Sequence, residues 1–170
     1  MTGNAKILAW GVACSLLLVS PANADKRQAF RRDLQFFFDE IGSGYVALST
    51  KRDAGLDLDA LRGKSIEELA NLESTADFHR LLQRITATFG DSHFYTHVAE
   101  EWVSYLGFES DFAQGQVVVT SVGAELSASG DLQVGDQIVS FNGRPVAEEL
   151  SILSAYIGKS SPGAVQRYAA

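Results

Sequence analysis

One stretch, Ser129–Val146, constrains the fold more than any other part of this chain. Within it, Gly135-Asp136 predicts a turn, because glycine tolerates positive φ and aspartate can hydrogen-bond its own backbone. The residues that follow, Gln137–Phe141, include β-branched and aromatic side chains and predict a half-buried strand. Asn142-Gly143 is the strongest short-range signal for a tight type I′ turn, so the chain is expected to reverse direction there.

Two segments upstream belong with this stretch. Gln116–Val122 is valine-rich and predicts a second strand, and Tyr105–Phe108 reads Tyr-Leu-Gly-Phe, an apolar loop that leads into a further strand. Taken together, these segments resemble a PDZ domain. The most specific part of the resemblance is Leu132–Gly143, which reads Leu-Gln-Val-Gly-Asp-Gln-Ile-Val-Ser-Phe-Asn-Gly.

The PDZ resemblance implies a peptide-binding groove and a partner. The expected partner is a protein or peptide substrate that is bound through its C-terminus. The resemblance implies that the carboxylate loop consists of Tyr105, Leu106, Gly107 and Phe108, and that the helix expected over residues 148–157 forms the second wall of the groove. Tyr105 stands where the family has glycine, which would tighten or partly close the groove.

The first residues have the pattern of a secretory leader. Met1–Ala24 has a positive charge at Lys6, an apolar run over Ile7–Val19 and a small-x-small cleavage site at Ala22-Asn23-Ala24. Cleavage after Ala24 and a location in the periplasm or outside the cell are therefore expected, with no stable membrane insertion afterwards. A retained N-terminal anchor is the alternative, although the apolar run is short for a membrane span.

Charge and composition exclude several functions. The chain has 14 Lys+Arg against 21 Asp+Glu, and an acidic exported protein is a poor candidate for binding nucleic acid or anionic membranes. The single cysteine, Cys14, lies in the leader, so neither a disulfide nor a thiol nucleophile is expected. No metal site is expected, because His93 and His97 would be about 13 Å apart along a strand, too far to bind one ion. No other cofactor is expected either.

Residues 25–98 are predicted to be helical in the main. An apolar stripe from Phe30 to Tyr45 predicts one amphipathic helix. Asp57 predicts the start of a short helix to Leu61, and a capping box at Ser65–Glu68 predicts another to about Leu72. The clearest helix starts at Ser74 or Thr75 and ends at Gly90, with an apolar face formed by Phe78, Leu81, Leu82, Ile85 and Phe89.

That last helix runs into Asp91-Ser92-His93, which is followed by a strand-like segment to Val98. On residue types alone, the tripeptide is more often an ordinary turn with a partly buried histidine than a catalytic site. The order of the chain favours a catalytic site, because a leader, a helical region ending in Asp-Ser-His and a PDZ domain resemble the tail-specific and tricorn-type serine peptidases. The resemblance implies that His93 is the general base and that Ser92 is a neighbour that orients its imidazole.

We therefore expect an α+β fold in which a small N-terminal helical bundle precedes a PDZ-like, partly open β-barrel with flanking helices. The expected units are a leader (1–24), a helical domain (25–98), a PDZ-like domain (99–158) and the start of a helix leading to a further domain (159–170). The expected function is that of the N-terminal part of an exported serine endopeptidase, which would be inactive without its downstream nucleophile. Two alternatives remain open: a Ser-Lys pair downstream, with His93 structural, or a non-catalytic exported PDZ module that binds peptides.

Overall fold

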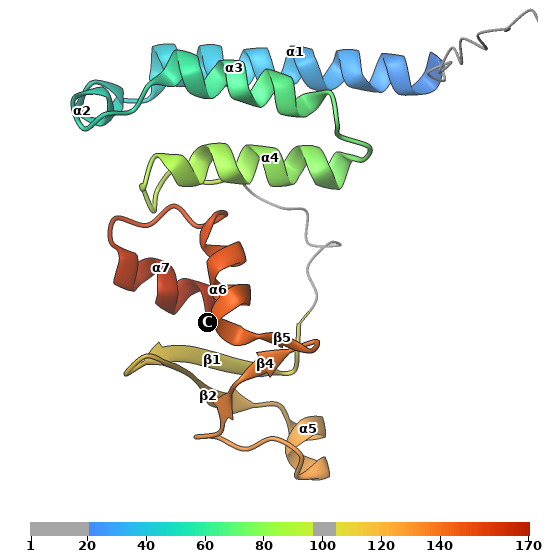
Figure 1. Ribbon diagram of the computed structural model, residues 1–170, viewed down its shortest axis with the longest axis vertical. Helices are drawn as coiled ribbons and strands as arrows, with labels where there is room; N and C mark the ends of the chain where they lie inside the picture. Colours follow the sequence, from blue (N-terminus) through green and yellow to red (C-terminus); the bar gives the residue numbers. More distant parts are fainter. Residues whose placement is uncertain (1–20, 97–104) are drawn as a thin grey trace, which may run out of the picture.

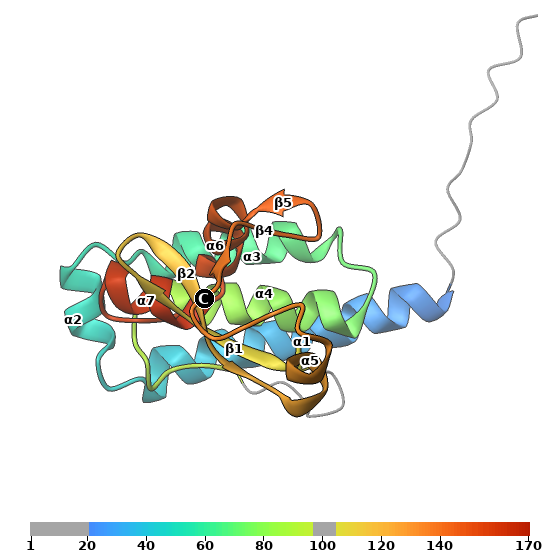
Figure 2. The ribbon, with the colours of Figure 1, turned by 90° about the horizontal axis from the view of Figure 1, so that it is seen from below.

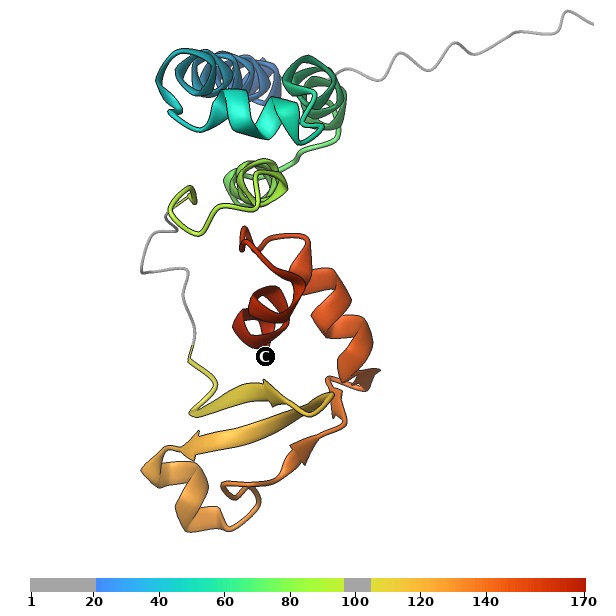
Figure 3. The same cartoon turned by 90° about the vertical axis from the view of Figure 1, so that its left-hand side faces the viewer.

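The computed structural model describes residues 21–96 and 105–170. Four helices form the N-terminal part: α1 (Pro21–Gly44), α2 (Leu48–Asp53), α3 (Leu58–Leu69) and α4 (Thr75–Thr88). In the views of Figures 1 and 3, these helices lie at one end of the molecule and the strands at the other, with the last two helices between them. Most of the predicted leader, Met1–Ala24, lies outside the described residues; α1 begins at its Pro21.

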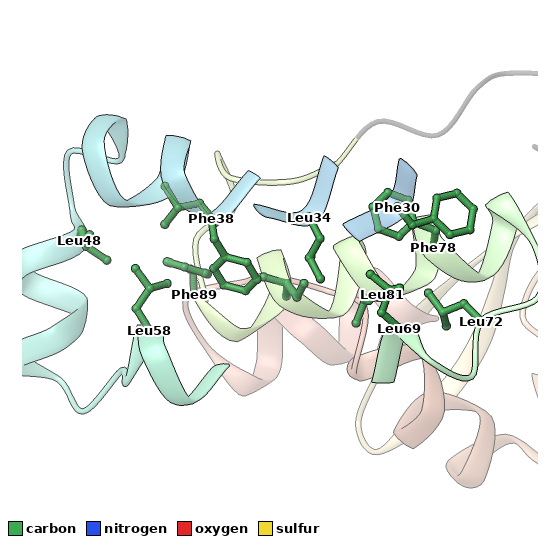
Figure 4. Packing of buried hydrophobic residues seen from close by; sticks show 12 residues of the cluster. Phe30, Leu34, Phe38, Leu48, Leu58, Leu69, Leu72, Phe78, Leu81 and Phe89 are labelled. Carbon is green, nitrogen blue, oxygen red and sulfur yellow. The ribbon is translucent and has the colours of Figure 1, made fainter. Parts of the chain in front are cut away.

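The helical part has a continuous apolar core. The stripes predicted on α1 and α4 face each other, and the Phe30 and Phe78 rings stack with their centroids 4.5 Å apart (Figure 4). A cluster of buried apolar side chains fills the space between the helices: Phe30, Leu34, Phe38, Ile41, Leu48, Leu58, Leu69, Leu72, Phe78, Leu81, Ile85 and Phe89. The start of α4 is fixed by the predicted cap, since Ser74 and Asp77 form a reciprocal capping box.

The prediction of two short helices after Asp57 was wrong. Asp57 does cap a helix, its side chain accepting a hydrogen bond from the Ala60 N–H, but that helix is α3 and it continues to Leu69. Ser65 lies inside α3, where it is buried and its hydroxyl donates to the Leu61 carbonyl. A serine in the interior of a helix can satisfy its hydroxyl in this way, so it does not have to start a new helix.

The C-terminal part consists of two small antiparallel sheets and three helices (Figure 2). A three-stranded sheet has the order β1 (Phe108–Ala113), β2 (Gln116–Val122) and β3 (Gln137–Ile138), and β4 (Ser140–Phe141) pairs with β5 (Arg144–Pro145). The helices are α5 (Ala124–Ser129), α6 (Val146–Ser154) and α7 (Pro162–Ala169). The α+β fold class is confirmed; in the described residues the strands do not close into a barrel.

Ser129–Val146, the stretch that most constrains the fold, is folded largely as predicted. Asn142 and Gly143 have φ of 49° and 80° and form a two-residue loop between β4 and β5, in agreement with the predicted type I′ turn. The predicted strand Gln137–Phe141 is interrupted at Val139, whose carbonyl accepts a hydrogen bond from the Val146 N–H. The interruption lets one segment pair first with β2 and then with β5.

The two parts of the chain touch through the loop between α6 and α7. A β-carbon at Gly158 would lie 3.3 Å from the Ala87 Cα and from the carbonyl oxygens of Thr86 and Asp91. Nearby, the Arg84 guanidinium lies over the Tyr156 ring, 5.6 Å from its centroid. The loop therefore packs against the C-terminal end of α4 and the turn that follows it.

Candidate functional site

The Asp-Ser-His turn follows directly from the end of α4. Gly90 has a φ of +56°, the left-handed conformation that ends many helices, and the Phe94 N–H donates to the Asp91 carbonyl to close the turn. The Phe94 ring packs on those of Phe89 and Tyr45, with both centroid distances 4.9 Å. The turn is thus anchored to the helical core by the Phe94 side chain.

Asp91 connects this turn to Tyr45, the residue that follows α1. Its Oδ2 accepts a hydrogen bond of 2.7 Å from the Tyr45 hydroxyl, and its Oδ1 accepts one of 2.9 Å from the His93 N–H. The hydrogen bond from the His93 backbone N–H, followed by that from the Tyr45 hydroxyl, holds the pKa of Asp91 below its usual range. Burial, followed by the Asp91 carboxylate, raises the pKa of Tyr45 to about 12. Asp91 is therefore ionised and fixed in place at neutral pH.

His93 projects into solvent from this fixed turn. Its side chain is 95% exposed, and its Nδ1 lies 3.5 Å from Asp91 Oδ1. An imidazole that faces a carboxylate on one side and is open on the other has the arrangement that a general base needs. Among the described residues, Asp91 is the acidic neighbour of the ring.

Among the described residues, no hydrogen bond joins the Ser92 side chain to the imidazole. Ser92 lines a cavity of about 330 Å³ at the junction of α4 with the α6–α7 loop, together with Thr86 and Gly158. The residues that hold the turn are Asp91 and Tyr45, neither of which the sequence reading assigned to the site. Asp91 could have been found as a carboxylate two residues before a histidine, whereas nothing in the sequence pairs it with Tyr45, 46 residues away.

The strand expected from His93 to Val98 is not formed at residues 93–96, which are turn and irregular. Instead, the Phe94 N–H donates to the Asp91 carbonyl within the turn, and the Phe94 ring packs in the helical core. His97 and Val98 lie outside the described residues. Within 21–96 and 105–170, no cluster of His, Cys, Asp or Glu could hold a metal ion, and no helix is long and apolar enough to cross a membrane.

The predicted carboxylate loop leads into β1 as expected. Gly107 has a φ of +81°, and its carbonyl accepts a hydrogen bond of 2.8 Å from the Gly123 N–H. This positive φ favours glycine, and a β-carbon here would lie 2.9 Å from the Leu126 Cδ1, so the end of that side chain would have to shift. Tyr105 is 91% exposed and does not line the groove, so it does not close it.

An apolar groove lies between β1 and α6. Its cavity measures about 210 Å³ and is lined by Leu106 and Phe108 from the loop, by sheet residues and by Val146, Leu150 and Leu153 from α6. β1 is at the edge of its sheet, because it pairs with β2 on one side only. An edge strand beside an apolar groove can accept an added peptide strand.

The last helix, α7, lies over the open edge of this groove. Ala169 and Ala170 line the cavity, and the Ser110 hydroxyl donates to the Ala170 carbonyl. Arg167 makes a bidentate ion pair with Asp111 on β1: its guanidinium donates hydrogen bonds of 3.0 and 2.6 Å to the two carboxylate oxygens. These contacts hold the end of α7 beside β1.

Comparison with known proteins agrees with this architecture. Residues 102–170 match the family model described as PDZ domain, so the chain carries a PDZ domain. One structural neighbour is a serine-to-alanine mutant of CPAF, with 19% sequence identity and a TM-score of 0.67. Another is mature CPAF, with 20% identity and a TM-score of 0.65.

Both similarities include the helical region, since each covers 84% of this chain. The chain spans 27% of the length of each of those proteins. At these identities the similarity establishes the fold. The comparison with curated proteins found no match.

Proposed function

We propose that this chain is the N-terminal part of an exported serine endopeptidase whose PDZ domain binds the C-terminal tails of its substrates. The similarity to CPAF, a protease, supports the assignment to a peptidase. Export is supported by the leader pattern of Met1–Ala24.

The observation that carries the proposal is the edge of β1 that pairs with no other strand in the described residues, beside an apolar groove. A peptide that pairs with β1 in the antiparallel direction would have its C-terminus at the loop Leu106–Phe108, whose backbone N–H groups would hold its carboxylate. The side chain of its last residue would enter the apolar cavity against Leu150 and Leu153. Main-chain pairing would supply affinity, and the cavity would select an apolar last residue.

The catalytic part of the proposal assigns the base to His93. Asp91 takes the orienting role that the sequence suggested for Ser92, because Asp91 lies beside the ring and is itself fixed by Tyr45. The exposed side of the imidazole would receive a proton from a serine supplied further along the complete protein, and would later return it to the leaving amine. A Ser-Lys pair is the competing arrangement, and it would leave His93 without a chemical role.

Calorimetry with one peptide in two forms tests the groove. A peptide with an apolar last residue should bind, and its amidated form should bind roughly tenfold or more weakly, since hydrogen bonds to a charged group are lost. Leu106→Ser should weaken binding of the free-acid form. Val134→Ser is the matched control, because Val134 is also an exposed apolar side chain but does not line the groove. Equal affinity for both forms would show that no carboxylate is recognised.

A further inference from the structure

The contact between α7 and β1 has a charge pattern that bears on the substrate. Asp111 is on the edge strand, and its side chain is 34% exposed, whereas that of Arg167 is 67% exposed. The pKa of Asp111 lies below its usual range, mainly because its carboxylate accepts hydrogen bonds from the Arg167 guanidinium. The Asp111 carboxylate on this edge strand is therefore ionised, and it is neutralised by Arg167 of the same chain.

The same position would face an added peptide strand. Residues directly opposite each other on antiparallel strands lie on one face of the sheet, with their side chains in contact. If the last residue of a bound peptide lies opposite Phe108, the residue about three positions earlier lies opposite Asp111, because paired strands advance one residue at a time. Asp111 would then meet that peptide side chain as it now meets Arg167.

We propose that Asp111 selects peptides with an arginine or lysine about three residues before the C-terminus, and that Arg167 of α7 occupies this position when no peptide is bound. The inference rests on the proposed function of the groove and names the class of substrate it takes. In Figure 3, α7 (red) lies beside β1 (yellow), where an added strand would have to enter. The peptide therefore displaces α7 as it binds.

The hold of α7 is weak enough for this exchange. None of its residues is buried, and an exposed ion pair stabilises by little because both groups remain solvated. A peptide that forms the same ion pair would also pair its backbone with β1, whereas α7 contacts β1 as a helix. The acidic charge of the chain, with 21 Asp+Glu against 14 Lys+Arg, further favours a basic peptide.

The test uses the full chain and three peptides that share the same apolar last residue. The first has arginine three residues before the end, the second has glutamine there, and the third has the arginine one residue later, on the opposite face. The first peptide should bind roughly two- to fivefold more tightly than the other two, the range of an exposed ion pair. Asp111→Asn should abolish this preference.

The matched control is Glu109→Gln, which removes the same charge two residues earlier on β1 and should leave the preference intact. Arg167→Gln should tighten binding of the first peptide, because the internal competitor is lost, and hydrogen exchange should show α7 less protected. If all three peptides bind equally to the natural chain, or if Arg167→Gln binds no more tightly, the inference is wrong and the groove remains a peptide site. If no peptide binds to the natural chain or to Arg167→Gln, the proposed function fails and the inference fails with it.

Discussion

The helical part and the PDZ part of this chain are stabilised differently. The helical part contains twelve buried apolar residues in one cluster, among them Leu34 and Phe38. In the PDZ part, the described buried apolar residues are Val117 and Val119. Large apolar side chains are exposed there instead: Tyr105, Leu106, Val134, Val139, Phe141, Ile152, Leu153 and Tyr168.

This difference agrees with the tasks proposed for the two parts. A base must be held in place, and the His93 turn is anchored on the densely packed side by Phe94 and Asp91. A groove must open to admit a peptide, and regions with few buried contacts open at a lower free-energy cost. The next three predictions test this separation, from the largest expected effect to the smallest.

Replacing His93 should affect chemistry and leave binding alone. In the longest protein that contains this chain, His93→Ala should lower turnover on the order of a thousandfold or more, because the base is lost. The melting temperature and the affinity for peptide should change little, since the side chain is 95% exposed. Peptide cleavage, calorimetry and thermal unfolding measure the three quantities.

The other outcomes distinguish the alternatives. Full cleavage per folded molecule in His93→Ala would contradict the role of base and favour a Ser-Lys pair. Peptide binding without cleavage in the natural protein would favour the non-catalytic binding module.

Core substitutions should cost more in the helical part than in the PDZ part. Phe38→Ala should lower the free energy of unfolding by about 3–5 kcal/mol, because it leaves a cavity at a residue that is 1% exposed. Phe36→Ala on the same helix is the control, since Phe36 is 66% exposed, and it should cost at most about 0.5 kcal/mol. Val119→Ala should cost about 1–3 kcal/mol. Urea unfolding measures all three, and an equal loss for Phe38→Ala and Val119→Ala would contradict the comparison.

The contact between Tyr45 and Asp91 should give the smallest effect and a pH signature. Tyr45→Phe removes one hydrogen bond and should lower the free energy of unfolding by about 1 kcal/mol at neutral pH. Because folding raises the pKa of Tyr45 from 10.0 to about 12, the stabilisation is complete below pH 10 and is lost as the pH rises towards 12. Stability should therefore fall less steeply between pH 10 and 12 in the variant. Parallel curves for the two proteins would contradict this coupling.

The sequence predicted the elements that local chemistry determines. Ser74 as a cap, Gly90 as a helix end and the Asn142-Gly143 turn each depend on a few neighbouring residues, and each prediction is confirmed. Ser65 matched a local cap pattern equally well, but packing of a continuous α3 placed it inside the helix.

Contacts between distant segments could not be predicted in this way. The site depends on Tyr45 meeting Asp91 and on Arg167 meeting Asp111, pairs that lie 46 and 56 residues apart. Neither pair leaves a periodic or spaced signal in a single sequence. The candidate residues of the turn and the loop could therefore be named, while the groups that hold or cover them could not.

Gly158 has a consequence for how this protein can vary. The atoms that a side chain at residue 158 would meet are all backbone atoms, those of Thr86, Ala87 and Asp91. Because every amino acid offers the same backbone, this contact does not depend on the side chains of residues 86, 87 and 91. The constraint therefore falls on residue 158 of the loop, since any β-carbon there would require the backbone of α4 or of the turn to give way by a few tenths of an ångström.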